Sequence, residues 1–138
     1  MRYLLDTNVL IHILRGYDTG SIRAHFKTNN GRMFISAVTV DELMFGICCT
    51  PEALREKKLG ELNTVLSAIP VLDFNEDAAE HSAEIRHFLK TYGQPIGSYD
   101  NMIAGHARSQ ELIVITNNVR EFCRVPGLQV EDWSQPVT

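Results

Sequence analysis

Residues 112–118 read Leu-Ile-Val-Ile-Thr-Asn-Asn, and this stretch decides the fold. Four apolar residues followed at once by polar ones are typical of a short strand that is buried on both faces. Such strands occur in parallel sheets that helices cover on both sides. The stretch therefore predicts an α/β protein, with polar side chains placed where a central strand ends.

The same order of a short apolar run, a polar turn and a helix occurs twice earlier in the chain. One apolar run ends at Asp6 and another ends at Ser36, and apolar residues recur at helical spacing after each. We expect Thr7 and Asn8 to cap the first helix and Ser36 to cap the second. This alternation predicts a parallel β-sheet flanked by α-helices.

The middle of the chain continues the alternation. Thr50-Pro51 predicts a helix start with threonine as the cap and proline as the first helical residue. Residues 71–72 are a strand candidate, and Asn75 and Ser98 are expected to cap the next two helices.

Length and composition fit one domain that spans residues 1–138. With 44% hydrophobic and 22% charged residues, the chain is neither a disordered nor a membrane protein. No apolar run is long enough to cross a bilayer, so we expect a cytoplasmic protein without membrane association. The three cysteines, Cys48, Cys49 and Cys123, have no metal-ligand or disulfide spacing, and we expect small buried side chains in a reducing compartment.

The charge balance limits the way in which this protein can contact nucleic acid. Thirteen basic against seventeen acidic residues give a net charge of −4, which excludes a protein that coats duplexes. Any contact with nucleic acid must be local. Arg120 and Arg124 flank Phe122 just after the polar end of the buried run, where they would meet a phosphate backbone or pair with nearby acids.

Ligands of parallel sheets bind beyond the carboxyl ends of the strands. Asp6 follows the first strand directly, and two helices can add Glu42 and Asp100 at the same edge. The polar residues that follow the buried run are Thr116, Asn117 and Asn118. Clustered carboxylates favour a hard divalent cation such as Mg²⁺ or Mn²⁺ over zinc. Such a cation lowers the pKa of a bound water, so the pattern suits hydrolysis of a phosphodiester.

Each of these residues also has a purely structural interpretation. Asp6 is a possible helix cap, and Asp100 suits the positive end of a helix dipole. Glu42 could lie exposed beside Asp41, and the two asparagines are ordinary turn residues. Their placement at one edge of the predicted sheet is what favours a common site.

Four ordered blocks of sequence resemble PIN-domain ribonucleases. The blocks are residues 4–8 (LLDTN), 36–43 (SAVTVDEL), 96–107 (IGSYDNMIAGHA) and 116–122 (TNNVREF). The closing segments, 125–128 (VPGL) and 131–133 (EDW), are similar to the VapC toxin branch of bacterial toxin–antitoxin pairs. The resemblance spans nearly the whole chain.

The resemblance implies a PIN-like parallel sheet, an Mg²⁺- or Mn²⁺-dependent endoribonuclease toxin, a homodimer and inhibition by a VapB-type antitoxin. Structured RNA is the implied substrate, with transfer RNA the leading candidate. Asp6, Glu42 and Asp100 match the acidic metal ligands of the family. Many PIN domains carry a fourth acid where Asn118 stands, so the resemblance implies that Asn118 is the fourth catalytic residue with Asp6, Glu42 and Asp100, although Glu121 lies near enough to replace it. The supporting positions are Thr7, Asn8, Thr116, Asn117 and Glu121.

Two other classes of protein remain open at this point. A PIN fold that has lost catalysis and serves as an RNA- or protein-binding module would explain the amide at Asn118. A phosphoaspartate enzyme would also place Asp6 after its first strand, but Asn8 stands where the dehalogenase pattern requires a second acid. Metal-dependent cleavage of RNA distinguishes the nuclease from both.

Overall fold

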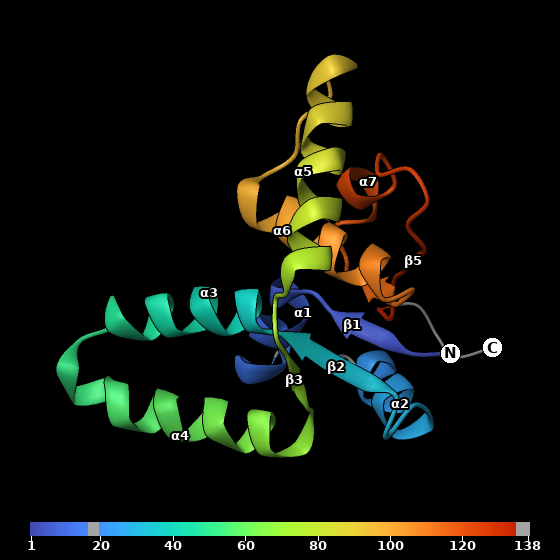
Figure 1. Cartoon of the computed structure of the whole chain (residues 1–138). Helices are drawn as coiled ribbons and strands as arrows, with labels where there is room; N and C mark the ends of the chain where they lie inside the picture. The colour runs from blue at the N-terminus through green and yellow to red at the C-terminus, as the bar shows by residue number, and fades with distance from the viewer. Residues whose placement is uncertain (17–19, 135–138) are drawn as a thin grey trace.

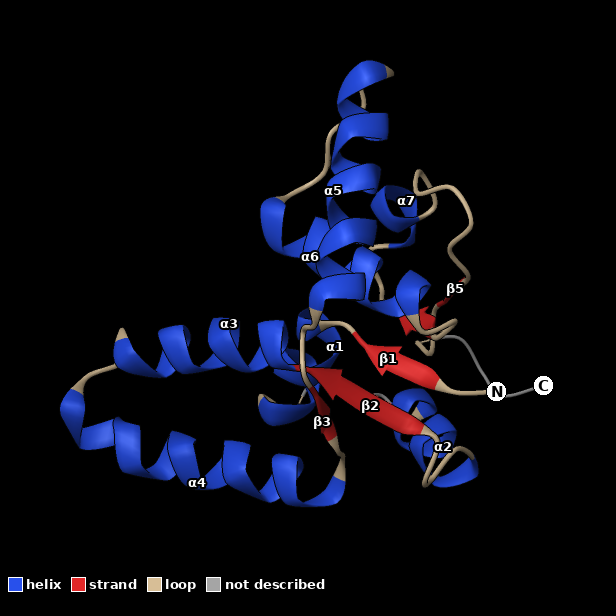
Figure 2. Cartoon of the chain, viewed as in Figure 1, coloured by secondary structure: helices blue, strands red, loops and turns tan. Residues whose placement is uncertain are grey.

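The computed structural model describes residues 1–16 and 20–134, and within them five parallel strands form one sheet (Figure 2). The strands are β1 (Tyr3–Leu5), β2 (Met33–Ser36), β3 (Val71–Leu72), β4 (Ile113–Ile115) and β5 (Val130–Glu131). They lie in the order β3-β2-β1-β4-β5. The predicted parallel sheet flanked by helices is therefore confirmed.

Helices cover both faces of the sheet (Figure 1). They are α1 (Thr7–Leu14), α2 (Ser21–Thr28), α3 (Ala37–Cys48), α4 (Glu52–Ala68), α5 (Glu76–Thr91), α6 (Ser98–Ser109) and α7 (Val119–Phe122). Tyr3 and Leu5 pack with α1 to α4, whereas Leu4 and Val114 pack with α5, α6 and α7. Alternate residues of the central strands thus enter opposite cores, which is why these strands are apolar at every position.

Helices α3 and α4 form a hairpin that extends away from the body of the protein (Figure 1). Cys48 and Cys49 lie where α3 ends, and both are exposed, as is Cys123. The prediction that the cysteines are buried is wrong. Few neighbours surround the tip of a projecting hairpin, so small apolar side chains there stay in contact with solvent.

Two of the predicted helix caps are confirmed by their hydrogen bonds. The Ser36 side chain accepts from the amide of Val38 at the start of α3, and the Asn75 side chain accepts from the amide of Ala78 at the start of α5. Both capping residues have an extended backbone, as an N-cap requires.

Three other helix starts differ from the prediction. The sequence predicts caps at Thr7 or Asn8, at Thr50 and at Ser98. The residues at these caps are Asp6, Pro51 and Gly97, and none of them makes a side-chain capping bond. The Thr50 hydroxyl instead donates to the carbonyl of Gly46 at 2.9 Å, so this side chain closes α3 rather than opening α4.

Helices α2 and α7 and strand β5 were not expected from the sequence. Helix α2 buries only Ile22, and β5 has two residues. The ring of Trp133 connects α2 to β1, because it packs against His25 and Phe26 of α2 and against Tyr3 of β1. Long-range packing around one tryptophan therefore holds α2 against β1, although the sequence of α2 carries little signal.

The strand order reverses between β1 and β4, and the polar edge at their carboxyl ends, around Asp6 and Thr116, is called the crevice. The chain runs from β1 outward to β2 and β3, then crosses back to β4 on the other side of β1. At such a reversal the connections leave in opposite directions, and ligands bind there in open α/β sheets. Asp6 follows β1 and Thr116 follows β4 at this point.

Candidate active site

Asp6 lies at the centre of the crevice and is 2% exposed. Its amide donates to the Ile115 carbonyl at 2.8 Å, which holds the end of β1 to β4. Its carboxylate accepts from the Thr116 hydroxyl at 2.9 Å. Burial raises the pKa of Asp6 to about 6, although hydrogen bonds from Thr116 and from the Thr7 amide oppose the shift.

Glu42 reaches the crevice from helix α3. The Thr7 hydroxyl donates to Glu42 Oε1 at 2.6 Å, and it also lies 3.1 Å from the Thr39 hydroxyl. Because Thr7 has one hydroxyl hydrogen, Thr39 must be the donor in that second bond. The Thr7 side chain therefore fixes the Glu42 carboxylate next to the start of α1.

Asp100 enters the crevice from the first turn of α6. The pKa of Asp100 is raised to about 7, chiefly by burial and also by the negative charges of Asp6, Glu121 and Glu42 and by a hydrogen bond with Glu121. The charges of Glu42 and Glu121 likewise raise the pKa of Asp6. Four carboxyl groups from four parts of the chain thus act on one another at the crevice.

Glu121 and Asn118 have different places in this arrangement. The Asn118 side-chain amide donates to Glu121 Oε2 at 3.0 Å, and the Asn118 backbone amide donates to the Thr116 hydroxyl at 2.9 Å. Glu121 in turn interacts with Asp100. The side chain of Asn118 therefore holds a carboxylate that faces the other acids.

The chemistry of the four carboxylates fits a hard divalent cation. Within residues 1–16 and 20–134, none of the four forms an ion pair with a basic side chain. No three acidic, histidine or cysteine side chains in that part of the chain already stand in an arrangement that could hold a metal ion. The acids are close enough for each charge to disfavour ionisation of the others. Their side chains would have to rotate to bring the carboxylate oxygens around one ion.

Comparison with known proteins identifies the family. The family model described as PIN domain matches residues 3–128. The tRNA(fMet)-specific endonuclease VapC of Shigella flexneri is 44% identical over 134 residues, which cover 97% of this chain and 99% of the relative. The protein of the same name from Salmonella typhimurium is 41% identical over 133 residues, which cover 96% and 98%. The chain belongs to the VapC ribonucleases of the PIN domain family.

The solved structure of DNA-bound VapBC from Salmonella typhimurium is similar to this PIN domain along its whole length. The TM-score is 0.90 at 41% identity, over 96% of this chain and 98% of that chain. The predicted fold and the predicted function as an endoribonuclease toxin are confirmed. None of the helices in the described part of the chain is long and apolar enough to cross a membrane.

The remaining predicted residues of this PIN domain differ in how deeply they are buried. Thr7 and Thr116 are buried, whereas Asn8 and Asn117 are exposed. Arg120 is exposed on α7. Arg124 is half-buried and donates to the Pro95 carbonyl at 3.3 Å, so it ties the segment after α7 to the loop before α6.

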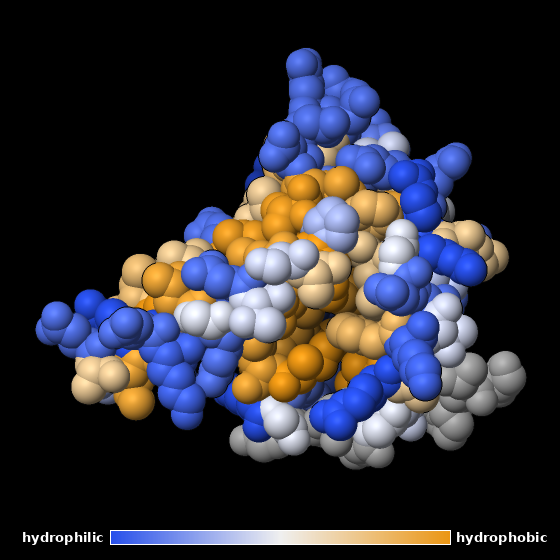
Figure 3. Space-filling model, turned by 90° about the horizontal axis from the view of Figure 1, so that it is seen from below, coloured by the Kyte–Doolittle hydropathy of each residue, from blue (hydrophilic) through white to orange (hydrophobic). Residues whose placement is uncertain are grey.

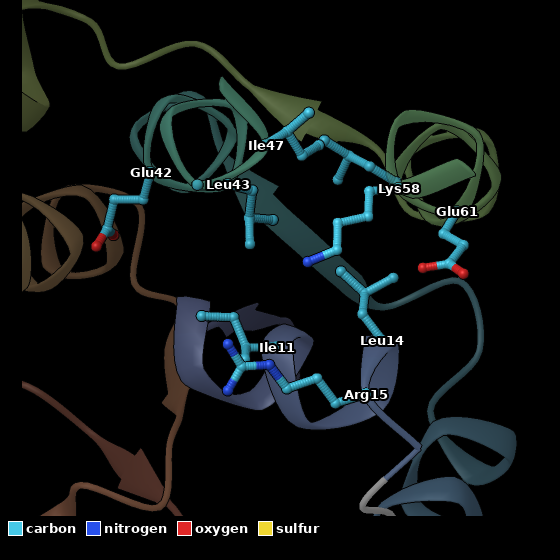
Figure 4. A pocket seen from close by; sticks show the side chains of 10 residues that line it. Ile11, Leu14, Arg15, Glu42, Leu43, Ile47, Lys58 and Glu61 are labelled. Atoms are coloured by element: carbon cyan, nitrogen blue, oxygen red, sulfur yellow. The ribbon is translucent and has the colours of Figure 1, made fainter. Parts of the chain in front are cut away.

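A groove of about 190 Å³ runs between helices α1, α3 and α4 of this PIN domain, with Glu42 at one end (Figure 4). Its lining is mainly apolar and includes Ile11, Leu14, Leu43, Ile47 and Leu62. The Lys58 side chain points into the groove, whereas the Glu42 carboxylate points away from it (Figure 4). The view from below also shows apolar surface between charged margins (Figure 3).

Sequence reasoning did not assign a role to Thr39, Tyr99 or His106 of this PIN domain. Thr39 bonds to Thr7, and its position three residues before Glu42 on one helix face was the available signal. The Tyr99 hydroxyl lies 3.5 Å from Asp41 Oδ2 across α6 and α3, and no sequence pattern indicates that contact.

Proposed function

We propose that Asp6, Glu42 and Asp100 hold Mg²⁺ or Mn²⁺ for the hydrolysis of RNA, with Glu121 as the fourth acid in place of Asn118. The observation that carries this proposal is the mutual effect of the acids, since their charges raise the pKa of both Asp6 and Asp100 at a crevice without a basic partner in the described chain. A divalent cation removes that repulsion.

The side chains around the acids have distinct roles in this mechanism. A bound divalent cation would lower the pKa of an attacking water and neutralise charge on the leaving oxygen. The Thr116 hydroxyl stabilises ionised Asp6, and the Thr7 hydroxyl orients Glu42. Asn118 orients Glu121 toward Asp100. The exposed Asn8 and Asn117 each follow a threonine that bonds to one of the acids, and their amides would contact substrate phosphate.

The products of cleavage test this chemistry. A metal-activated water leaves 5′-phosphate and 3′-hydroxyl ends, and chelation with EDTA stops the reaction. Attack by the ribose 2′-hydroxyl would leave a 2′,3′-cyclic phosphate and would be insensitive to EDTA. End-mapping of cut RNA with and without EDTA distinguishes the two, and cyclic ends would refute the metal site.

The fourth ligand is tested by titrating Mn²⁺ into the free protein in a calorimeter. We expect Glu121→Gln to weaken Mn²⁺ binding, because a carboxylate charge is lost beside Asp100. Asn118→Asp should fail to tighten binding, because the new charge would repel Glu121 at the position where the amide now donates to it. Tighter binding by Asn118→Asp with unchanged binding by Glu121→Gln would reverse the assignment.

We infer transfer RNA as the substrate, with initiator tRNA first among the candidates. The support is the identity of 41–44% to two relatives that carry the name tRNA(fMet)-specific endonuclease. Arg120 precedes Glu121 on α7 and Arg124 follows it by three residues, so both basic side chains are near the fourth acid in the sequence and suit contacts to RNA phosphates. Primer extension on total tRNA should give one dominant cut, and Arg120→Gln should raise KM more than it lowers kcat.

We infer that a VapB-type antitoxin inhibits this protein by laying an amphipathic segment in the α1–α3–α4 groove. The support is the apolar lining of the groove, its opening beside Glu42, and the VapBC complex of the Salmonella relative. An arginine of that segment would pair with Glu42 and its neighbouring acids. Leu14→Asp should weaken inhibition and retain RNA cleavage, whereas Leu54→Asp on the exposed side of α4 should change neither.

We further infer a homodimer formed through exposed aromatic side chains. Phe45 on α3 and Tyr92 on α5 are each 68% exposed, and Phe88 packs against Tyr92. Exposed aromatic groups of this size are typical of protein contacts. Sedimentation should give twice the mass of the chain, and Phe45→Ser with Tyr92→Ser should give the monomer. A monomeric wild-type protein would contradict this inference.

A further inference from the structure

His106 is a buried polar side chain to which the mechanism above gives no role. It is fully buried within α6, and its Nδ1 lies 2.7 Å from Ser36 Oγ. Its Nε2 has no hydrogen-bond partner in the described chain. An apolar residue of similar size would fill the same space without burying an unpaired nitrogen, so packing alone does not account for a histidine here.

The hydrogen-bond partner of His106 is Ser36, the N-cap residue of helix α3. Ser36 is the last residue of β2, is fully buried, and accepts from the Val38 amide at 3.1 Å as the α3 cap. Its hydroxyl therefore bonds to α3 and α6 at once. Glu42 is carried by α3 and Asp100 by α6, so this pair of side chains is a buried polar link between the two acid-bearing helices.

A second link fixes α3 on its other side, where Thr39 bonds to Thr7 of α1. Glu42 lies six residues beyond Ser36, which is about 9 Å along a helix. A rotation of α3 by about 6° about its start therefore displaces the Glu42 backbone by about 1 Å, a displacement that can lower catalysis about a hundredfold.

The surroundings of His106 keep the imidazole neutral. Burial lowers its pKa, while the charge of Asp73 acts in the opposite direction. The Phe74 ring packs edge-on to the imidazole, with 5.6 Å between the ring centroids. A neutral imidazole can either accept from the Ser36 hydroxyl or donate to it, and both arrangements preserve the link.

We propose that His106 is a positioning residue for RNA cleavage, which acts through Ser36 to hold α3 and its Glu42 at the correct distance from Asp100 on α6. This proposal rests on the proposed metal site, because it assumes that Glu42 and Asp100 must converge on one cation.

The test compares four single variants and the double variant His106→Leu with Ser36→Ala, all in the full chain, by Mn²⁺ calorimetry and by RNA cleavage at saturating Mn²⁺. His106→Leu removes the link and retains an apolar side chain, and His106→Asn places an amide close to the position of Nδ1. Ser36→Ala removes both the link and the cap. Asn75→Ala is the matched control, because it removes the equivalent cap of α5. That helix carries none of the four carboxylates of the proposed metal site.

We expect His106→Leu and Ser36→Ala to lower kcat at least tenfold and to weaken Mn²⁺ binding, with little change in KM. The double variant should be no worse than the more damaging single variant, and His106→Asn should recover part of kcat. Asn75→Ala should lower thermal stability but keep kcat and Mn²⁺ affinity. Equal kcat in Asn75→Ala and His106→Leu, or additive losses in the double variant, would overturn the proposal.

The same data separate this proposal from the proposed metal site. A wild-type protein that cleaves RNA but binds no Mn²⁺ would refute the metal site, and the kcat comparison would still decide the role of His106. Normal Mn²⁺ binding by wild type together with unchanged kcat in His106→Leu would refute the positioning role alone.

Discussion

Replacing Asp6 by asparagine should stabilise the metal-free protein at high pH while it abolishes cleavage. The carboxyl group has a pKa of about 6 in the folded protein against an ordinary value of 3.8. Below pH 4 the group is protonated in both states, so it contributes no difference. Between about pH 4 and 6 the unfolded chain has lost this proton while the folded protein still holds it, so the free energy of unfolding falls by about 3 kcal/mol across this range and is level above it.

Asparagine keeps the shape and an acceptor for the Thr116 hydroxyl, but it does not ionise. In EDTA at pH 8, urea unfolding should therefore give Asp6→Asn about 3 kcal/mol more stability than wild type, and the two should converge toward pH 4. The control Glu80→Gln changes an exposed acid on α5 and should give only a small difference in stability.

Divalent ion should reverse the order of stability. At pH 8, wild type should gain about 4.1 kcal/mol when Mn²⁺ is present at about a thousand times its dissociation constant, which exceeds the advantage of about 3 kcal/mol that Asp6→Asn has in EDTA, while Asp6→Asn should gain much less from the ion. An asparagine variant that is less stable than wild type at every pH in EDTA would refute the reasoning, because it would mean that burial of Asp6 does not disfavour its ionised form.

Three further outcomes follow from the structure. Asp100→Asn should lower RNA cleavage at least a hundredfold with an unchanged circular dichroism spectrum, and normal cleavage would exclude Asp100 from the site. Gly105→Ala should lower the free energy of unfolding by about 1–3 kcal/mol, because the added Cβ would lie 2.4 Å from the Ser82 amide nitrogen. Gly60→Ala meets open space in α4 and should raise the free energy of unfolding by about 1 kcal/mol, as measured by thermal unfolding. Arg108→Met removes three hydrogen bonds that join α6 to α5 and to the segment after α7, and should cost about 1–3 kcal/mol in urea unfolding; no loss would show that these bonds are replaced by water.

Local chemistry was sufficient for much of the fold and for the identity of the acids. Strand β4 could be found because a strand buried on both faces has no polar position. The caps of α3 and α5 could be found because Ser36 and Asn75 bond to backbone amides two and three residues away. Asp6 could be singled out because the residue after a central parallel strand faces a possible ligand crevice.

Interactions between distant segments decided the rest. The sequence offered both Asn118 and Glu121 as the fourth polar group, and only their packing shows the amide donating to the carboxylate beside Asp100. The exposure of Cys48 and Cys49 depends on how far the α3–α4 hairpin projects, which no pattern within those helices records. The position of Trp133 likewise determines α2, whose own residues bury little surface.

The sequence by itself therefore determined a parallel α/β fold and which side chains are available for chemistry at the strand ends, because periodicity and capping are properties of neighbouring residues. The tertiary structure decided the pKa values of Asp6 and Asp100, because these depend on burial and on charges from helices α3 and α7 and, for Asp100, also from Asp6 after β1. It also decided the contact between His106 and Ser36, since a hydrogen bond between residues 70 positions apart exists only when two helices are packed together.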